Sequence, residues 1–304
     1  MIIVFGSIGL DIVQSVRRLP RPGETVLTAD YAMLPGGKGA NQALAAARAG
    51  AAVCFAASIG DDDFGQRALV NLDRAGVDIA DVARRGRPTA CATISVDSAG
   101  ENQIVVSSGA NLETVAAQMN PKAGDIVLQQ MEIPLPEIWA GIDLAHARGA
   151  KTILNAAPFQ PIPASALAKL DVLIVNEVEA QMLGDDLGLG AAGLPGICAG
   201  VRQRFATTVV LTVGAGGAMA FSPDQTLQAG ILAIQALDTV GAGDAFVGAF
   251  VAAMADGMSL ADCLRWGSVA GGLTCLKPGA QDGVPERAAI EARRDEISIT
   301  PISN

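Results

Sequence analysis

The sequence predicts an α/β fold in which a mostly parallel central sheet is flanked by helices. Along the 304 residues, short β-branched runs alternate with longer stretches that are rich in Ala and Leu. The short runs are hydrophobic along their whole length, which is typical of parallel strands covered on both faces. Two other segments alternate apolar and polar residues instead, and this pattern indicates strands that lie outside the main sheet.

The elements of the main sheet can be placed in order. The expected strands are Ile2–Phe5, Val53–Ala57, Asp125–Leu128, Thr152–Leu154, Val172–Val175 and Val209–Val213. The expected helices between them are Ala43–Ala49, Phe64–Ala75, Leu135–Arg148, Ala164–Leu170 and Gly193–Phe205. Gly50 directly follows the first helix and has the place of a C′ residue that ends it. The uncharged stretch from Ala206 to Pro223 contains three glycines and predicts a strand, a turn and a strand rather than a membrane span.

The two irregular segments are Ile12–Leu34 and Pro88–Val106. Each carries an apolar–polar repeat with turn-forming residues inside it, such as Gly23 in the first and Gly100 in the second. This combination predicts hairpin strands that form a small antiparallel subdomain beside the main sheet.

The composition argues against several classes of partner. A formal charge of −10 and a pI near 4.6 disfavour nucleic acid and anionic membranes. An anionic substrate would therefore have to be held locally, by loops and a metal. The five cysteines include no Cys-x-x-Cys pair, so we expect buried thiols in a reducing compartment and no zinc site. The N-terminal apolar run at 2–5 has no basic region or cleavage site beside it, and we expect a cytoplasmic protein.

The most informative motif is Asp-Thr-Val-Gly-Ala-Gly-Asp at 238–244, which leads directly into an apolar run. Within that run Phe246, Phe250 and Met254 are spaced i, i+4 and i+8, which predicts one buried face of a helix. Residues 241–243 would then lie at the helix N-terminus.

A helix N-terminus collects unpaired backbone N–H groups and the positive end of the helix dipole, and small residues let an anion approach them closely. The site therefore suits a phosphate or a developing phosphoryl charge, and Asp244 could take a proton from an attacking hydroxyl. The alternative is a glycine-rich turn in which Asp244 only caps a core helix.

A second motif, Gly-Gly-Lys-Gly-Ala-Asn-Gln at 36–42, opens another Ala-rich helix. It is neither a P-loop nor a dinucleotide fingerprint, because the spacings of glycine and of Lys-Ser/Thr that define those motifs are missing. Two such loops, each leading into a helix of an alternating chain, make a phosphate site more probable than either loop alone.

With these motifs the sequence resembles the ribokinase-like (PfkB-type) carbohydrate kinase family, essentially from end to end. The two glycine motifs are its most specific signatures, and the other matches are Gly6-Ser7-Ile8 with Asp11, Gly60-Asp61-Asp62 with Gly65, Gly100-Glu101-Asn102, Gln130-Met131-Glu132 with Pro134, Leu154-Asn155 with Ala157-Pro158, Asn176-Glu177 with Glu179, and Gly279-Ala280-Gln281 with Val284-Pro285. The resemblance implies an ATP- and Mg²⁺-dependent kinase acting on a sugar primary hydroxyl, with D-ribose to D-ribose 5-phosphate as the first expectation. It also implies one domain over 1–304, whose segments at about 12–34 and 88–106 form a small β-sheet lid through which the protein would form a homodimer.

The resemblance further assigns roles to individual residues. Asp244 would be the general base, beside an anion hole formed by Gly241, Ala242 and Gly243. The sugar would be bound by Asp11, Gly37, Lys38, Asn41, Glu132 and Asp244. The nucleotide would contact Asn176, Thr212, Gly214 and Gly217. Glu179 would hold Mg²⁺ through water, and a monovalent cation, expected to be K⁺, would be ringed mostly by carbonyls at Asp238, Val240 and Gly279.

Taken singly, several of these residues have plainer explanations. Asp11 would fit an exposed loop acid and Glu132 a strand-end acid, while Asn176 and Glu179 would fit a polar helix start. The nucleotide-contacting glycines would fit a tight turn. The lone His146, near the end of a predicted helix, is assigned no catalytic role.

Two positions depart from the family pattern. Gly9 replaces an asparagine that would bind the sugar, and Gly283 replaces a serine near the cation site. The first departure leaves another sugar or a nucleoside open as the substrate, although the low aromatic content of 4% disfavours a nucleoside base. A sugar phosphate also stays open because of Arg17, Arg18 and Arg21. A non-catalytic sugar sensor is the alternative from another class, and the intact 238–244 motif argues against it.

Overall fold

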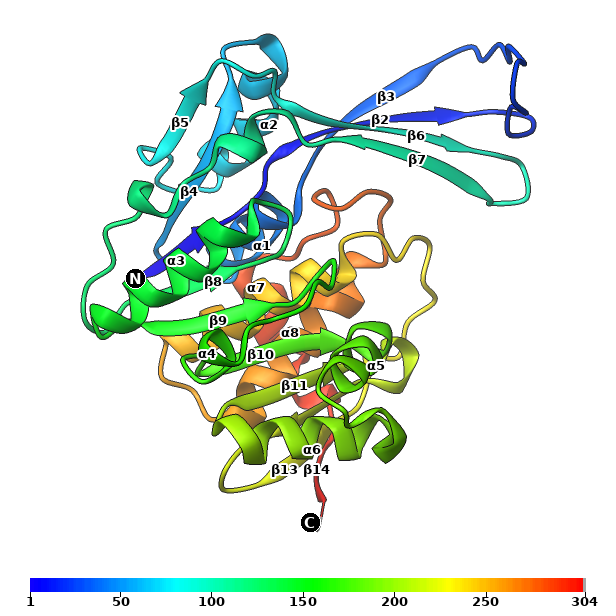
Figure 1. The fold of residues 1–304 in the computed structure, drawn as a ribbon. Coiled ribbons are helices and arrows are strands. Elements are labelled where there is room, and N and C mark those ends of the chain that lie inside the picture. The colour runs from blue at the N-terminus through cyan, green and yellow to red at the C-terminus, as the bar shows by residue number, and fades with distance from the viewer. Residues whose placement is uncertain (303–304) are drawn as a thin grey trace.

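A computed structural model describes residues 1–302, and its centre is a ten-stranded sheet (Figure 1). Seven neighbouring strands run parallel, in the order β5 (Val82–Arg85), β4 (Val53–Gly60), β1 (Ile2–Phe5), β8 (Ile126–Gln129), β9 (Lys151–Asn155), β10 (Val172–Asn176) and β11 (Thr208–Thr212). Three antiparallel strands extend the edge beyond β11, namely β12 (Ala218–Phe221), β13 (Thr226–Ala229) and β14 (Ile299–Ile302). The expected mostly parallel sheet is confirmed, and residues 206–223 form a strand, a turn and a strand.

Helices cover both faces of this sheet and enclose two hydrophobic cores. One core includes residues of α1 (Lys38–Arg48), α2 (Asp63–Arg74), α7 (Ala242–Ala255), α8 (Leu260–Thr274) and α9 (Arg287–Arg293). The other includes residues of α3 (Leu135–Ala147), α4 (Ala164–Leu167), α5 (Glu177–Asp186) and α6 (Gly193–Phe205). Alternate residues of β1 serve the two cores, with Ile2 and Val4 in the first and Ile3 and Phe5 in the second, as the period of a strand requires. Single 3₁₀ turns lie at Gly109–Glu113, Ala116–Gln118, Gly190–Ala192, Gly214–Gly216 and Arg294–Glu296.

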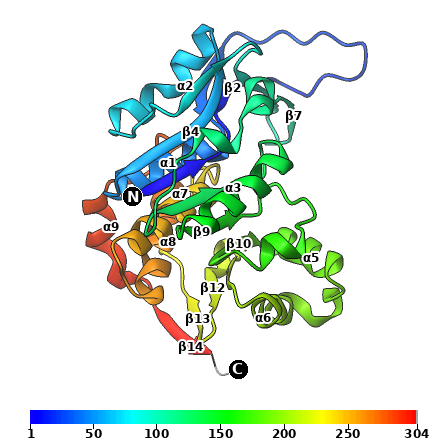
Figure 2. The same cartoon turned by 60° about the vertical axis from the view of Figure 1, so that its left-hand side comes forward.

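A second sheet of four strands extends away from the main body (Figure 1). Its order is β3 (Tyr31–Gly36), β2 (Gly9–Ser15), β6 (Ala90–Val96) and β7 (Asn102–Ser107). Both hairpins are antiparallel as expected, and β2 and β6 join them by pairing in parallel. The long loop between β2 and β3 projects at the upper right of Figure 2.

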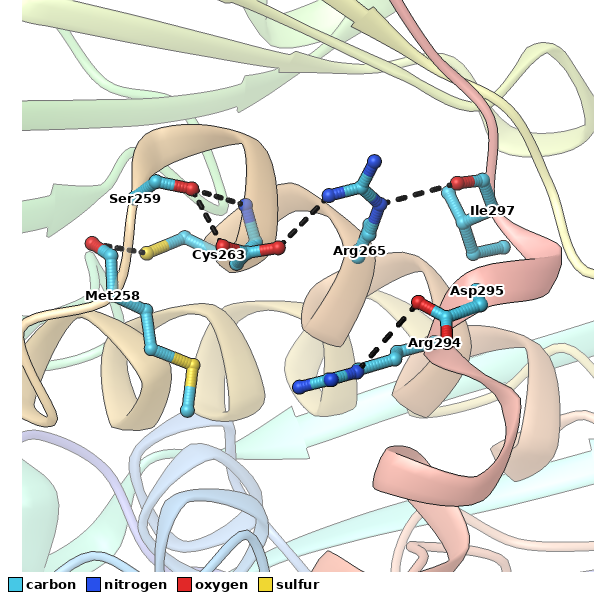
Figure 3. Close-up of polar contacts among 8 residues, drawn as sticks. Met258, Ser259, Cys263, Arg265, Arg294, Asp295 and Ile297 are labelled. Atoms are coloured by element: carbon cyan, nitrogen blue, oxygen red, sulfur yellow. Dashed lines mark hydrogen bonds and ion pairs between the residues drawn. The ribbon is translucent and has the colours of Figure 1, made fainter.

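The C-terminal strand is tied to α8 by polar side chains (Figure 3). Ser259 caps α8 by accepting a hydrogen bond from the backbone N–H of Asp262 at 3.2 Å. Arg265, one turn later, donates to Asp262 at 2.8 Å and to the carbonyl oxygen of Ile297 at 3.3 Å. These contacts hold the chain just before β14, and β14 then completes the edge of the main sheet.

The helix that follows the 238–244 motif is buried on every side, not on one face as its spacing predicted. Nearly every residue from Asp244 to Ala253 is buried, and Met254, assigned to the buried face, is only half-buried. The reason is that α7 is packed between the sheet, α1 and α8. A helix that is apolar all round is expected in such a central position.

The structure also bears on the expectations about cysteines, metal-binding groups and membrane spans. Four of the five cysteines are buried, whereas Cys91 is half-buried on β6. Within residues 1–302 no group of three or more His, Cys, Asp or Glu side chains is placed to hold a metal ion. In the same part of the chain, none of the helices has the length and apolar character needed to cross a membrane.

Helices α1 and α7 approach each other at Gly248. A Cβ atom built at Gly248 would lie 2.5 Å from Cβ of Ala45 and 2.6 Å from the carbonyl oxygen of Gln42. Both distances are well inside van der Waals contact, so the two helices are packed at their minimum separation. This approach brings the N-terminal turn of α1 beside the N-terminal turn of α7.

We therefore predict that Gly248→Ala destabilises the protein by about 1–3 kcal/mol, because the added methyl group must push two buried helices apart. Chemical denaturation measures the change. Gly200→Ala in α6 is the matched control, since its methyl group would meet only the end of the Leu189 side chain, at 3.1 Å, and alanine favours a helix. Equal stability of the two variants would contradict a tight contact at Gly248.

Candidate active site

Polar side chains gather where the parallel strands end. Ligand sites of open α/β sheets lie at the carboxyl ends of the strands. Here those ends supply Ser7 after β1, Gln130 and Glu132 after β8, Asn155 at the end of β9, Asn176 at the end of β10 and Thr212 at the end of β11. Helices α1 and α7 also begin here. Side chains in their first turns hydrogen-bond to one another, and Gln42 of α1 hydrogen-bonds to Asn155 at the end of β9.

Asp244 lies in the first turn of α7 and is buried. Its Oδ2 accepts a hydrogen bond from Nδ2 of Asn41 at 2.9 Å, and its Oδ1 accepts one from Nε2 of Gln42 at 2.9 Å. Gln42 also donates to Oδ1 of Asn155 at 2.9 Å. Two neighbouring residues of the 36–42 motif thus hold one oxygen each of the carboxylate in the 238–244 motif.

Two further glutamines complete this polar cluster. Nε2 of Gln130 donates to Oε1 of Gln42 at 2.7 Å, and Nε2 of Gln281 donates to Oδ1 of Asn41 at 2.9 Å. Gln130, Asn155 and Gln281 were not predicted to be neighbours of Asp244, although all three belong to motifs that match the family. Asn41, expected to bind the sugar, already uses its carbonyl oxygen and one of its two N–H groups on protein partners.

Asp11 and Glu132 lie near each other, on the side of the site that faces the small sheet. Oε2 of Glu132 accepts hydrogen bonds from the Ser7 hydroxyl at 2.6 Å and from the backbone N–H of Lys38 at 3.0 Å. Burial, together with the negative charge of Glu132, raises the pKa of Asp11 to about 6. The Asp11 carboxylate packs against the Gly36 backbone, where a Cβ atom would lie 2.6 Å from its Oδ2.

Lys38 is the cation that balances these acids. The charge of Asp244 raises the pKa of the Lys38 ammonium, burial opposes this rise, and Glu132 and Glu179 add to it. Acidic side chains from three separate parts of the chain therefore interact with the same ammonium group. The structure thus brings together Asp11, Lys38, Glu132 and Asp244, as the resemblance predicted.

The expected anion hole is built on a glycine that no other residue could replace. Gly241 has a φ of 78°, and a Cβ atom there would lie 2.6 Å from both Cα and the carbonyl oxygen of Ala280. Among residues 1–302 no side chain caps α7, and the space beside Gly243 is open. The N-terminus of α7 is therefore accessible to an anion.

Asp238 ties the anion-hole turn to the loop that contains Gly279. Its Oδ1 accepts from the backbone N–H of Val240 at 3.0 Å, and its Oδ2 accepts from that of Gly279 at 2.8 Å. The three residues predicted to surround a monovalent cation are thus brought together. Within the part of the chain that the structure describes, no hydrogen bond uses the carbonyl oxygens of these three residues.

A cavity of about 590 Å³ adjoins the anion hole. Its lining includes Asn176, Thr212, Gly214 and Gly217, the four residues predicted to contact a nucleotide, and Gly243. The lining also includes apolar residues that were not predicted, among them Ile231, Leu232, Ile234, Phe246 and Gly271. These apolar residues come from a loop and from two helices, so no sequence spacing marked them as one group.

Asn176 and Glu179 form a capping box at the start of α5, in agreement with the plainer explanation of these residues. The side chain of Asn176 accepts from the Glu179 N–H at 2.9 Å, and Oε2 of Glu179 accepts from the Asn176 N–H at 2.8 Å. Burial raises the pKa of Glu179, the hydrogen bond from Asn176 and the charge of Lys38 oppose the rise, and Asp244 adds to it. Glu179 therefore lies close enough to the site for the charges of Lys38 and Asp244 to act on it.

The structure explains both departures from the family pattern. A Cβ atom at Gly9 would lie 2.6 Å from the carbonyl oxygen of Ala90, because β6 pairs closely with β2 there. A Cβ atom at Gly283 would collide with the carbonyl oxygen of Thr274. Neither position has room for a larger side chain, so asparagine at 9 would require the two strands to move. His146 is exposed in the last turn of α3, away from the site.

Comparisons with known proteins agree with this geometry. Residues 1–287 match the family described as pfkB family carbohydrate kinase. A ribokinase of Haemophilus influenzae is 34% identical over 296 residues, covering 93% of this chain and 95% of the relative. The structure of a Thermotoga maritima ribokinase has a TM-score of 0.88 at 29% identity, covering 96% of this chain and 98% of that one. An Arabidopsis thaliana ribokinase complexed with ribose and ATP has a TM-score of 0.86 at 31% identity, with the same coverage.

The raised pKa of Asp11 gives a prediction for stability against pH. The Asp11 carboxyl ionises at a higher pH in the folded chain, about 6, than its ordinary value of 3.8, so folding is disfavoured as pH rises from about 4 to about 6. We expect Asp11→Asn to be more stable than the parent by about 1–3 kcal/mol at pH 8, with the difference closing toward pH 4. Urea unfolding at the two pH values measures it.

Asp224→Asn, in an exposed turn between β12 and β13, is the control and should leave the pH dependence of stability unchanged. If the difference in unfolding free energy between the parent and Asp11→Asn is the same at pH 4 and pH 8, burial does not disfavour the ionised form of Asp11.

Proposed function

The chain belongs to the pfkB family of carbohydrate kinases, and on that premise we propose that it transfers the γ-phosphoryl group of ATP to the primary hydroxyl of D-ribose, giving D-ribose 5-phosphate. The observation that carries the proposal is the position of Asp244. It lies in the first turn of α7, where it accepts a hydrogen bond from Asn41 and directly follows Ala242 and Gly243, which line the cavity. A sugar hydroxyl and a phosphoryl group would meet at this carboxylate.

The sugar would occupy the side of the site formed by Asp11, Lys38, Asn41 and Glu132, with Gly37 in the turn beside it. A polyol loses a water partner for each hydroxyl it buries, so the pocket must supply replacements. Carboxylates, an ammonium and an amide do so. Gly37 has a φ of 93°, and a Cβ atom there would lie 2.8 Å from Cα of Ile8, so only glycine allows this turn beside the proposed sugar site.

ATP would occupy the cavity of about 590 Å³. Its base fits the aliphatic wall of Ile231, Leu232 and Ile234, and its phosphates fit the glycines and the start of α7. With ATP bound in this way, its γ-phosphate would lie next to the proposed anion hole.

Two metal ions are part of the proposal, and the residues present fit both. Glu179 is a buried carboxylate with one oxygen uncommitted, which suits Mg²⁺ held through water. The carbonyls of Asp238, Val240 and Gly279, joined by the Asp238 side chain, suit a K⁺ ion. When bound, these ions would neutralise phosphate charge in the transition state.

In the reaction, Asp244 would orient the sugar hydroxyl and accept its proton while the hydroxyl oxygen bonds to the γ-phosphorus and ADP leaves. The backbone N–H groups of Gly241 and Gly243 would stabilise the charge that develops on the phosphoryl oxygens, while that of Ala242 donates to the carbonyl oxygen of Thr239 at 3.3 Å. Lys38 would add a positive charge between the two substrates, as its response to Asp244 and Glu132 indicates.

We further propose that the chain acts as one domain over residues 1–304, with the small sheet as a lid over the sugar. Strand β7 is an unpaired edge with every residue exposed, including Ile104, Val105 and Val106. Such an edge invites pairing with another strand. A homodimer formed through the two lids would cover it.

Gly9 favours a second candidate, a kinase for another sugar. Without a side chain at position 9 the pocket lacks one hydrogen bond to the sugar. Such a hydrogen bond is worth about 0.5–1.5 kcal/mol, so the enzyme should discriminate only weakly between sugars that differ at that hydroxyl. A panel of pentoses, hexoses and nucleosides in an assay of ADP release decides between these substrates.

In that assay, Asp244→Asn should lower kcat by at least 10²-fold with D-ribose while the affinity for ATP stays within a few-fold, because removing the base acts on the transition state. Asp256→Asn, at the C-terminal end of the same helix, is the control and should retain activity. An Asp244→Asn enzyme with more than a tenth of the parent kcat would remove Asp244 from the mechanism.

A second prediction concerns the monovalent cation. At fixed ionic strength, the rate should rise with K⁺ and not with Na⁺, since carbonyl oxygens in two joined loops suit the larger ion. Equal rates in K⁺, Na⁺ and a bulky organic cation would argue against the site at Asp238, Val240 and Gly279.

A further inference from the structure

A continuous chain of side-chain amides, all buried except the half-buried Asn71, ends at Asp244. On one side Asn71 of α2 donates to Gln281 at 2.9 Å, Gln281 donates to Asn41 at 2.9 Å, and Asn41 donates to Asp244 at 2.9 Å. On the other side Gln130 donates to Gln42 at 2.7 Å, and Gln42 donates to Asp244 at 2.9 Å. The carboxylate is the terminal acceptor of both branches.

The direction of every bond follows from the charge on Asp244. An ionised carboxylate only accepts hydrogen bonds, so the amide nitrogens of Asn41 and Gln42 must point toward it. Their carbonyl oxygens must then point away and need donors, which Gln281 and Gln130 provide. A protonated Asp244 would have a hydroxyl oxygen that accepts an amide N–H more weakly than a carboxylate oxygen does, so the network favours the ionised form.

The network leaves one buried carbonyl oxygen without a hydrogen bond from any residue that the structure describes. Amides that only satisfied one another would not require this. Oε1 of Gln130 is buried and has no hydrogen-bond partner among the described residues. Gln130 is thus turned so that its N–H serves Gln42 while its own carbonyl oxygen goes without a donor. Gln42 is fully buried, and its two N–H groups serve Asn155 and Asp244.

We propose that these amides are positioning residues, with Gln42 the principal one, and that they hold Asp244 ionised and aimed at the incoming hydroxyl. The inference deepens the proposed kinase function and rests on it for its catalytic meaning. Each oxygen of Asp244 keeps a further lone pair, which is sufficient for one substrate hydroxyl. The amides themselves do not touch the reacting atoms.

The charged groups that face Asp244 come from other positions. Lys38 of α1 and Glu179 of α5 interact with its charge, and Glu132, after β8, interacts with Lys38. None of these three side chains hydrogen-bonds to Gln42 within residues 1–302, so a change at Gln42 leaves their charges in place. The effect of the amide can therefore be separated from theirs.

The test compares Gln42→Leu and Gln42→Glu with the parent. Gln42→Leu removes the donor to Oδ1, and Gln42→Glu keeps the shape but sets a second carboxyl against Asp244, so that the two share a proton. The control is Gln118→Leu, because Gln118 is a half-buried amide that donates to backbone carbonyls, of Ala57 at 2.7 Å and Asp81 at 3.1 Å, and not to Asp244.

Two measurements are made on each protein. The first is the pKa of Asp244, followed through its ¹³C-carboxyl resonance in aspartate-labelled protein and assigned with Asp244→Asn. The second is the pH dependence of kcat at saturating ribose and ATP, conditions in which Asp11 is covered by sugar. We expect both the resonance and the acid limb of kcat to move up by about one to two pH units in Gln42→Leu, and further in Gln42→Glu. The plateau kcat should fall about tenfold or more.

Gln118→Leu should lose stability without moving either titration. Unchanged titrations in both Gln42 variants would overturn the inference and reduce Gln42 to a packing residue. A parent that phosphorylates no sugar would instead overturn the proposed function, and the ¹³C titration would still decide whether the amides hold Asp244 ionised. If Gln42→Leu does not fold, Gln42→Glu carries the same comparison.

Discussion

The site depends on the close approach of two buried helices. Because Gly248 has no side chain and α1 is rich in alanine, the backbones of α7 and α1 nearly touch. Their N-terminal turns therefore lie side by side, and Asn41 and Gln42 reach both oxygens of Asp244. Bulkier residues at this contact would separate the two glycine motifs, which lie about two hundred residues apart in the sequence. The chemistry of the site is thus set by packing before any ligand binds.

Charge in the site is balanced locally rather than by the protein as a whole. The chain carries a net charge of −10 and still has to hold a polyphosphate. Lys38 lies among Asp244, Glu132 and Glu179, and the acid nearest the small sheet, Asp11, has its pKa raised to about 6. Backbone N–H groups at the start of α7 add positive potential without adding a side chain. An acidic protein can bind an anion when its donors are fixed dipoles and one well-placed cation.

The sequence was sufficient for the parts of the structure that depend on local pattern. The six strands and the five helices expected around the sheet are all present, with ends that differ by a few residues. It could not reveal the amide network, because Gln281 and Asn41 are 240 residues apart and only the tertiary fold brings them together. Nor could it explain Gly9 and Gly283, whose size is dictated by the backbones of Ala90 and Thr274. Burial of α7 on all sides was likewise decided by its neighbours, not by its own spacing.

The network around Asp244 also bears on how this residue would act in the proposed reaction. Each oxygen of its carboxylate accepts an N–H from a buried amide, so the direction of the carboxylate is set by the protein. Phosphoryl transfer through a loose transition state needs little proton removal before the new bond forms. What such a reaction does need is alignment of the hydroxyl with the phosphorus. A carboxylate held on both oxygens suits that need, because the site then depends on direction more than on strength as a base.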